Sequence, residues 1–335
     1  MAKRRGNKID GWLALDKPLG LSSAQAVARV RRLFGAAKVG HGGTLDPLAS
    51  GVLPIALGEA TKTVAWVMDG AKEYRFTIRW GIATATDDAE GDVVATSDVR
   101  PSDAALVAVL DRFRGRIEQR PPAFSALKVA GQRAYALARG GAEVELAPRQ
   151  VEIHDIQFLE GTDDSPILWV RCGKGTYIRS LARDIAQALG TVGHVATLRR
   201  TACGPFHETE AVSLDTLIAA AGDAAGNVLS PPVDLGHTSA LFGYLRPVVT
   251  ALDDIPALAL TDREAQRLSQ GMAVKLPEEG GRPAAPIGTM SPAEGSAGPA
   301  TDASKGVVRA MAGNRLVAIA RIDAGLVRPV RVLNL

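Results

Sequence analysis

Apolar and polar residues alternate most clearly over residues 72–80. The apolar side chains there are Tyr74, Phe76, Ile78 and Trp80, and the polar ones are Glu73, Arg75, Thr77 and Arg79. Successive side chains of a β-strand point to opposite faces, so this pattern predicts a strand with one buried face. Such a strand is typical of an antiparallel sheet that packs against the core on one side. Residues 167–172 predict a second strand.

Two segments in the first third of the chain have a helical pattern. The first helix is expected to begin at Ser22 or Ser23, either of which can cap it, and to end at Gly35. A further helix is expected over residues 102–113. The apolar face of the first helix is formed by Val27, Val30, Leu33 and Phe34.

A third helix is predicted after the second strand. It begins at Tyr177, with Thr176 as its cap, and Gly190 ends it. Residues 173–176 (Gly-Lys-Gly-Thr) lie between the strand and the helix, but they do not complete the G-x-x-x-x-G-K-[ST] pattern of a phosphate-binding loop. We therefore interpret them as a tight turn. The apolar stripe of this helix comprises Ile178, Leu181, Ala182, Ile185, Ala186 and Leu189.

Two segments show neither the alternation of a strand nor the spacing of an amphipathic helix. Residues 40–51 contain four glycines and one proline, which predicts a turn-rich loop without a regular element, and residues 81–91 predict a polar loop. Within the first loop, Asp46 precedes Pro47 and has two interpretations. It is either the cap of a helix whose first residue is Pro47, or a carboxylate held on a rigid loop and ready to act on a substrate.

The end of the chain differs in composition from the rest. Of the 30 residues at 277–306, 20 are Gly, Pro, Ala or Ser, and such a segment cannot bury enough apolar surface to form a packed core. Residues 307–335 carry five arginines and one aspartate, and they predict two short strands, at 316–320 and 326–333. We expect a catalytic domain at 1–250 and a small basic, β-rich domain at 251–335 with a low-complexity insertion.

Composition and charge limit the classes of protein to which this chain can belong. The chain has 335 residues, a net charge of +3 and 46% hydrophobic residues, which is ordinary for a globular protein and excludes a wholly disordered one. Its two cysteines cannot build a disulfide scaffold. The basic start is not followed by the apolar stretch of a signal peptide, and no apolar run approaches the ~18 residues of a membrane span. We therefore expect a cytoplasmic protein.

Histidine and cysteine spacing offers no metal site. The five histidines and two cysteines form neither an H-x-x-x-H nor a C-x-x-C pair, and Gly204-Pro205 between Cys203 and His207 excludes a shared helix face. The G-x-S-x-G pattern of a serine nucleophile is also missing. Asp46 remains the strongest candidate for chemistry, and no metal is expected.

Residues 40–54 read Gly-His-Gly-Gly-Thr-Leu-Asp-Pro-Leu-Ala-Ser-Gly-Val-Leu-Pro, and further distinctive blocks stand in order between residues 16 and 206. Together these blocks resemble the bacterial tRNA pseudouridine-55 synthases of the TruB family. Residues 40–54, which contain Asp46, look like the signature motif of that family. The chain departs from many relatives at Gly42, where Thr is common, at Phe124, where Tyr is frequent, and in the insertion 277–306. The other matching blocks are Asp16-Lys-Pro18, Lys72-Glu-Tyr-Arg-Phe76, the loop 81–91, residues 120–128 with Gly131 and Tyr135, residues 175–180 and residues 194–201.

The resemblance implies both a fold and an activity. The fold is α+β, a pseudouridine synthase fold with a mixed, largely antiparallel central sheet, followed by a small β-rich domain similar to the PUA type. The activity is the isomerisation of uridine 55 in the TΨC loop of tRNA. Uracil is detached from C1′, rotated and rejoined through C5, so the atoms balance without redox change or net hydrolysis and no cofactor is required.

The resemblance also assigns residues to the site. Asp46 is the family's catalytic aspartate, either the nucleophile or the base for a sugar proton, and Arg179 is its cationic partner. For the base pocket, it implies that Tyr74 stacks on uracil, Tyr177 lines the pocket and Leu198 presses on the base. His41 would fill the gap in the RNA stack, and Lys17 would support the loop or a phosphate. The plainer alternatives are core packing for Tyr74 and Leu198, a loop contact for His41, and a solvated or phosphate-binding role for Arg179.

Other readings of function stay open at this point. An inert RNA-binding protein on the same scaffold would not need Asp46, and an enzyme acting on a different RNA with a guide RNA and protein partners is a further alternative. The short basic start and compact tail favour a stand-alone monomer that acts on tRNA, with no obligate protein partner and no membrane. Residues 112–149 carry eight Lys or Arg against three Glu, so we expect the basic groups to gather on one face and to bind phosphates.

Overall fold

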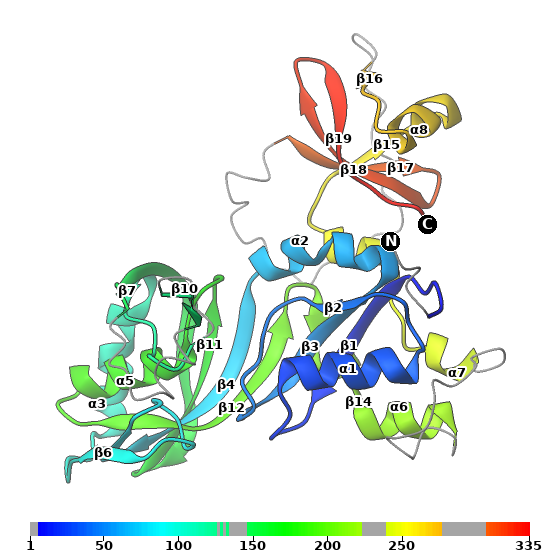
Figure 1. Ribbon diagram of the computed structural model, residues 1–335. Helices are drawn as coiled ribbons and strands as arrows, with labels where there is room; N and C mark the ends of the chain where they lie inside the picture. The colour runs from blue at the N-terminus through cyan, green and yellow to red at the C-terminus, as the bar shows by residue number, and fades with distance from the viewer. Residues whose placement is uncertain (1–5, 126–127, 130–131, 134–145, 223–238, 277–305) are drawn as a thin grey trace.

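The computed structural model describes residues 6–125, 128–129, 132–133, 146–222, 239–276 and 306–335. Within them, ten strands form one large mixed sheet and five form a smaller sheet near the C-terminus (Figure 1). The predicted α+β class is confirmed. The low-complexity segment 277–306 lies, except for Gly306, outside the described residues, as do most of residues 126–145.

The strand predicted at 72–80 lies in the middle of the large sheet. It is β4 (Lys72–Trp80), and it pairs antiparallel with both β11 (Ser165–Cys172) and β12 (Gly193–Cys203). Phe76, Ile78 and Trp80 are buried, so the predicted apolar face is confirmed. The remaining order runs outwards through β3 (Ala49–Leu57), β1 (Gly11–Lys17) and β14 (Val212–Ser213) on one side, and β10 (Arg149–Thr162) and β7 (Gly115–Gln119) on the other.

Helices cover one face of this sheet in two groups. Figure 1 shows α1 (Ser23–Leu33), α6 (Leu214–Ala221) and α7 (Ser239–Phe242) on one half, and α3 (Asp103–Leu110) and α5 (Ile178–Ala188) on the other. Ser22 caps α1 through its hydroxyl, as the sequence predicts. α1 and α5 therefore lie on opposite halves of the sheet, and α5 packs against β12 and β4.

Three predictions about local structure are wrong in part. The loop predicted at 40–51 overlaps β2 (Val39–His41) and the start of β3. β2 pairs with β3, and β3 pairs with β1. The loop at 81–91 contains β5 (Ile82–Thr84), which pairs with β6 (Val93–Thr96). Thr176 does not cap α5, because its hydroxyl donates to Gly173 O at 3.1 Å and Tyr177 takes the cap position.

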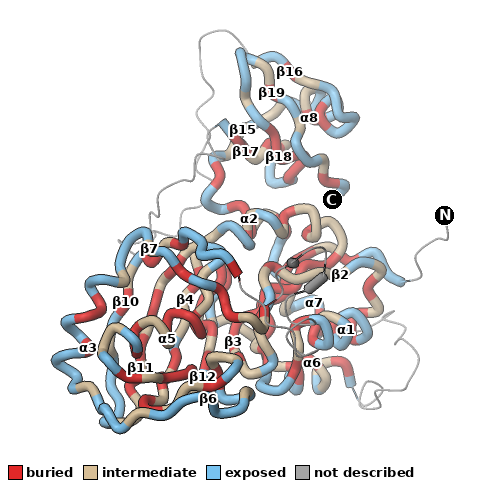
Figure 2. The backbone as a smooth tube through the Cα atoms, turned by 60° about the vertical axis from the view of Figure 1, so that its left-hand side comes forward, coloured by how far each residue is buried: buried red, intermediate tan, exposed pale blue. Residues whose placement is uncertain are grey.

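The smaller sheet lies above the large one in Figure 1, on the far side of the helix labelled α2. Its strand order is β15 (Ala257–Ala259), β17 (Val307–Ala312), β18 (Arg315–Asp323), β19 (Leu326–Val332) and β16 (Val274–Lys275), with α8 (Asp262–Ser269) against it. One apolar cluster joins Trp12 and Val52 of the large sheet to Met311 and Ile319 of the small one. Buried residues therefore run through the junction near α2 (Val64–Asp69), as Figure 2 shows.

The small sheet matches the two strands predicted for the tail. Together with the large sheet it is consistent with a boundary near residue 250, and the two-domain division stays a prediction. No helix among the described residues is both long enough and apolar enough to cross a membrane.

Candidate active site

A cavity of about 460 Å³ opens over the centre of the large sheet, between the two helix groups. It is lined by the loop before β3, by β4 and β12, and by the turn that leads into α5. Five residues predicted for the site line it, and they come from four separate parts of the chain. They are Asp46, Tyr74, Tyr177, Arg179 and Leu198.

Asp46 lies on the short loop between β2 and β3. This loop is tied to α1, because Ser23 Oγ donates to Leu45 O and accepts from Leu45 N, both at 2.8 Å. No helix begins at Pro47, so the interpretation of Asp46 as a helix cap is wrong. Its carboxylate is 41% exposed and lies 2.9 Å from Arg179 Nη2, through Oδ2. Within the described part of the chain, its other oxygen, Oδ1, forms no hydrogen bond or ion pair with another residue and is available to a substrate.

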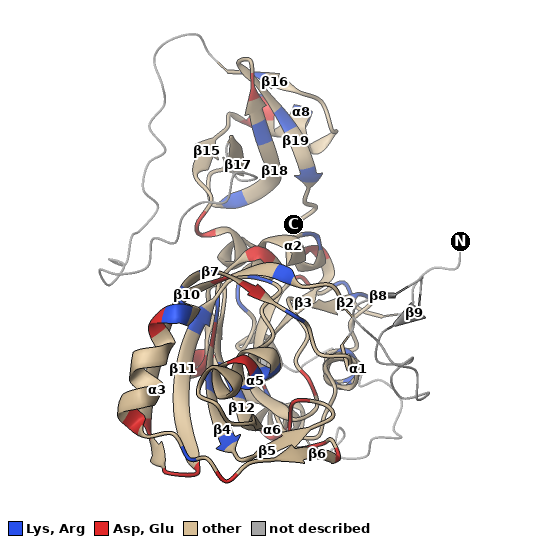
Figure 3. Ribbon diagram, turned by 90° about the vertical axis from the view of Figure 1, so that its left-hand side faces the viewer, with Lys and Arg blue, Asp and Glu red and all other residues tan. Residues whose placement is uncertain are grey.

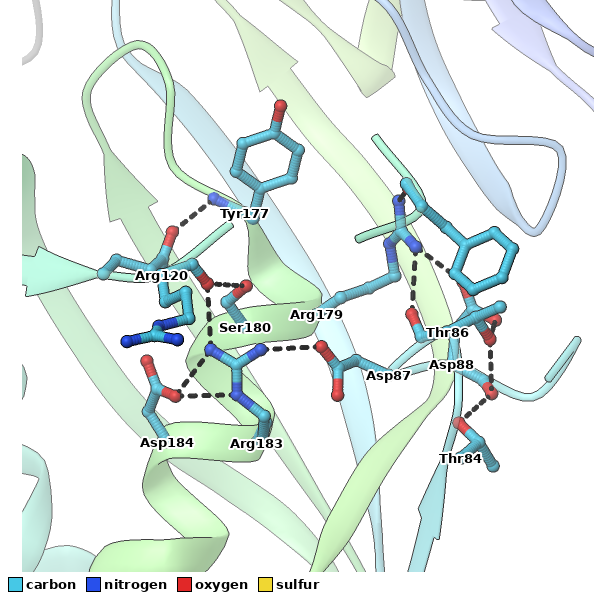
Figure 4. Close-up of polar contacts among 12 residues, drawn as sticks. Thr84, Thr86, Asp87, Asp88, Arg120, Tyr177, Arg179, Ser180, Arg183 and Asp184 are labelled. Atoms are coloured by element: carbon cyan, nitrogen blue, oxygen red, sulfur yellow. Dashed lines mark hydrogen bonds and ion pairs between the residues drawn. The ribbon is translucent and has the colours of Figure 1, made fainter. Parts of the chain in front are cut away.

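Arg179 on α5 is held by two carboxylates and two carbonyls. Its side chain is only 6% exposed, and Nη1 lies 3.3 Å from Asp88 Oδ2. Nη1 also donates to Thr86 O, and Nη2 to Phe124 O, each at 2.9 Å. A planar guanidinium with this many fixed acceptors has one orientation. It therefore places a fixed cation against Asp46, and Figure 4 shows its contacts with Thr86 and Asp88.

The loop that carries Asp88 is itself fixed to α5. Arg183 donates to Asp87 Oδ2 at 2.8 Å and to Arg120 O at 2.9 Å, and Ser180 Oγ donates to the same carbonyl at 2.8 Å (Figure 4). Burial raises the pKa of Asp87, while Arg183 opposes this rise. The network thus joins three separate loops to one helix, so that Arg179 has a rigid support.

Two tyrosines and a leucine form the walls of the cavity. Tyr74 comes from β4, and burial raises the pKa of its phenol to about 12. Tyr177 is held by its backbone N–H, which donates to Gln119 Oε1 at 2.8 Å, and burial raises the pKa of its phenol as well. Both phenols are therefore protonated at neutral pH. Leu198 on β12 adds an apolar surface beside them.

Lys17 and His41 do not line the cavity. Lys17 is completely buried, and its Nζ donates to Pro18 O and Leu21 O at 2.9 and 2.7 Å. These two bonds tie Lys17 to the segment between β1 and α1, and its predicted role stays a prediction. His41 is partly buried at the end of β2, and its Nδ1 accepts from Gly43 N at 3.4 Å. Burial lowers the pKa of His41, so its ring is neutral at neutral pH.

Some residues of the site were not given roles from the sequence. Asp88 and Thr86 belong to a matching block, but their contact with Arg179 joins positions about ninety residues apart. Arg200 and Lys72 also line the cavity. Strand alternation indicates both, because Arg200 shares a face with Leu198 and Lys72 with Tyr74. Arginine and lysine are rarely buried, so a sequence alone does not suggest that these two residues line a buried cavity.

The arrangement combines a carboxylate with a fixed cation and flat side walls. A carboxylate oxygen that faces a cavity can attack an electrophilic carbon or accept a proton. The aromatic rings and Leu198 suit a flat heterocycle, since every base has a π-face. The cavity is thus suited to polar chemistry beside a planar group.

Comparison with known proteins agrees with this geometry. A model described as "TruB family pseudouridylate synthase (N terminal domain)" matches residues 31–178, and one described as "tRNA pseudouridylate synthase B C-terminal domain" matches 179–254. A protein of Rhodospirillum rubrum named tRNA pseudouridine synthase B is 51% identical over 334 residues, covering 99% of each chain. One of the same name from Caulobacter vibrioides is 50% identical over 338 residues, covering 100% of each.

Solved structures show a similar fold. A chain in "Crystal Structure of a Cbf5-Nop10-Gar1 Complex" aligns with a TM-score of 0.67 at 25% identity, covering 96% of this chain and 84% of that one. A chain in "Structure of H/ACA RNP bound to a substrate RNA containing 2'-deoxyuridine" aligns with a TM-score of 0.68 at 22% identity, over 100% and 92%. The full-length likeness in sequence decides the matter: the chain belongs to the TruB family of pseudouridylate synthases, which are isomerases.

Proposed function

We propose that this enzyme converts uridine 55 in the TΨC arm of tRNA to pseudouridine, with Asp46 as its catalytic carboxylate. The observation that carries the proposal is the position of Asp46, which opens onto the cavity and is paired with Arg179 at 2.9 Å. The curated relatives are named tRNA pseudouridine synthase B, which supports pseudouridine formation in tRNA. Both the geometry and the relatives therefore favour the same reaction.

The substrate uridine has to leave the RNA stack before it can react. A stacked base hides its glycosidic bond, and extruding it costs a few kcal/mol. The cavity supports this step because its walls supply apolar and aromatic contacts for one extruded base. In this proposal Tyr74 stacks on uracil, Leu198 presses on its other side, and Tyr177 lines the entrance beside Arg179. His41, next to the loop, fills the space that the base leaves in the RNA.

The reaction moves one bond from nitrogen to carbon. The C1′–N1 bond breaks with its electron pair on N1, uracil turns in the pocket, and the C1′–C5 bond forms. C5 then loses its proton and N1 gains one, so that the product is an isomer of the substrate. Asp46 acts at the sugar, either by attacking C1′ or by taking the proton from C2′. In both routes Arg179 orients the carboxylate. We propose that the phenol of Tyr74, which lines the cavity, assists the transfer of the C5 proton.

RNA affinity is expected to come chiefly from phosphate contacts. The small sheet carries arginines on β18 and β19, which Figure 3 shows as blue bands, among them Arg321, Arg328 and Arg331. We propose that this sheet extends the RNA-binding surface beyond the cavity. The protein would then act as a monomer on tRNA without a guide RNA.

The test is release of tritium from [5-³H]uridine in tRNA transcripts. We expect one equivalent of tritium per tRNA, and none from a transcript with cytidine at position 55 and labelled uridines elsewhere. Release from the altered transcript would indicate a different target uridine. Binding of tRNA without any release would favour the alternative of an inert RNA-binding protein.

A further inference from the structure

Arg200 places a buried positive charge beside the cavity. Its side chain is among the largest that are fully buried, with 1% of its surface exposed, and it lines the cavity together with Tyr74. It lies on β12, opposite Tyr74 of β4 and Gly51 of β3. Gly51 has φ +99°, and a Cβ there would lie 2.2 Å from Arg200 O, so the close approach of β3 to Arg200 depends on glycine.

The guanidinium of Arg200 binds carbonyls and no carboxylate. Nε donates to Val52 O at 2.7 Å, Nη1 to Thr44 O at 3.3 Å and Nη2 to Gly43 O at 3.1 Å. Within the described ranges it has no ion-pair partner. An arginine buried without a counter-ion is unfavourable, because carbonyl dipoles only partly replace the water that it loses.

The charge of Arg200 shifts the pKa values of neighbouring side chains. Burial is the main cause of the lowered pKa of Lys17, His41 and Lys72, and repulsion from Arg200 lowers each of them further. Burial raises the pKa of Tyr74, and attraction to Arg200 opposes that rise. The phenol of Tyr74 also hydrogen-bonds Arg200, and the thiols of Cys172 and Cys203 lie near the guanidinium. Asp46 and Asp69 line the same cavity, but among the described residues neither forms an ion pair with Arg200. Its positive charge is therefore not neutralised by a bonded carboxylate, and the position is suited to a transient anion.

The proposed reaction creates such an anion. When the C1′–N1 bond breaks, both electrons stay with uracil, and the negative charge spreads over N1, O2, O4 and C5. The charge disappears when C5 bonds to C1′ and N1 takes up a proton. A fixed positive charge near the base stabilises the anion more than the neutral uridine, and such preorganised charges lower barriers in sites shielded from water.

We infer that Arg200 is a positioning residue with an electrostatic role: besides holding the loop 43–52, its buried guanidinium favours departure of uracil as an anion. This inference rests on the proposed function. It differs from the role of Arg179, which is paired with two carboxylates and serves the sugar side of the cavity. The alternative is that Arg200 only holds the loop through its three carbonyl contacts.

The two roles are separated by changing the leaving group. In 5-fluorouridine the fluorine withdraws electrons and stabilises the uracil anion, so its departure needs less help from the enzyme. Fluorine cannot leave C5 as the proton does, so conversion is followed by nucleoside chromatography and mass spectrometry after single turnover. The quantity compared is the ratio of the rates for uridine and 5-fluorouridine at position 55, which does not depend on how much of the enzyme is correctly folded.

Four variants make the test, two at Arg200 and two at Cys203. We expect Arg200→Met to slow uridine conversion by about 100-fold and 5-fluorouridine conversion by no more than about tenfold. Arg200→Lys, which keeps the charge, is slower than the wild type but keeps its ratio. Cys203→Asp, with Cys203→Ser as its control, neutralises Arg200 while leaving its loop contacts. It is expected to change the ratio as Arg200→Met does, and it serves if the methionine variant does not fold.

Equal losses with both substrates in Arg200→Met and Cys203→Asp would overturn the inference and leave Arg200 as a loop anchor. An unchanged rate in these variants would exclude both roles. Failure of the wild-type enzyme to convert uridine 55 would instead refute the proposed function.

Discussion

The two carboxylates that bind Arg179, Asp88 and Asp46, are expected to contribute differently to stability. Substituting each with asparagine, which has nearly the same shape, measures the two contributions separately. Asp88 is 4% exposed and Asp46 is 41% exposed, although both lie within 3.3 Å of the same guanidinium. Asp88 also accepts a short hydrogen bond from Thr86 Oγ1 and one from Glu90 N at 3.0 Å. Asp88 is thus the buried, fully bonded partner and Asp46 the open one.

The difference in burial sets the size of each effect. Removing one partner of a buried ion pair costs about 3–5 kcal/mol, because the other charge stays buried and unpaired. Arg179 keeps Asp46 and two carbonyls in Asp88→Asn, so the lower end, about 3 kcal/mol, is expected there. An ion pair exposed to solvent contributes about 0–1 kcal/mol, so Asp46→Asn is expected to change stability by less than about 1 kcal/mol.

Urea unfolding of the two variants and the wild type measures both values. Asp88→Asn is also expected to lose part of its activity, since Arg179 becomes less well oriented. Combining it with Arg179→Met should recover part of the lost stability, because the charge that then stays unpaired, on Asp46, is exposed to solvent. If Asp46→Asn destabilised the protein as much as Asp88→Asn, burial would not be what separates the two pairs.

Three further predictions concern a buried lysine, a phenol and salt. Burial lowers the pKa of Lys17 from 10.5 to about 8, so the unfolded chain binds more protons between these values. Stability relative to Lys17→Met should therefore rise with pH across that window, by roughly 3 kcal/mol in pH-dependent unfolding; a flat difference would contradict it. Tyr74→Phe should keep tRNA affinity and slow tritium release about 100-fold, and an unchanged release rate would remove its proton-transfer role. Filter binding should show tRNA affinity falling at least about 100-fold between 50 and 200 mM salt, whereas a constant affinity would exclude phosphate contacts as its main source.

The elements that the sequence predicts best are those with local causes. The strand β4 has the predicted bounds because its alternation is unbroken, and α1 begins after Ser22 because the hydroxyl caps it. The error over residues 40–51 has a physical reason as well. Glycine and proline discourage strands on average, but β3 runs beside β1 and β12, and that pairing outweighs the local preference.

The site was predictable only as a set of separate residues. Asp46, Tyr74 and Arg179 are each indicated by a local motif, yet the sequence does not show that Arg179 is shared between Asp46 and Asp88. That arrangement depends on α5 lying across the loop at 84–88, a contact between distant parts of the chain. Arg200 was missed for a different reason. Its buried guanidinium is stabilised by carbonyls of the loop at 43–44, and the sequence does not show that this loop lies beside it.

The most direct test of the account is the pair of wild type and Asp46→Asn, assayed for both tRNA binding and isomerisation. The substitution keeps the size of the side chain and removes its charge. We expect Asp46→Asn to bind tRNA with nearly the affinity of the wild type and to form no pseudouridine at position 55. Pseudouridine formation by this variant would contradict the assignment of Asp46 as the catalytic carboxylate.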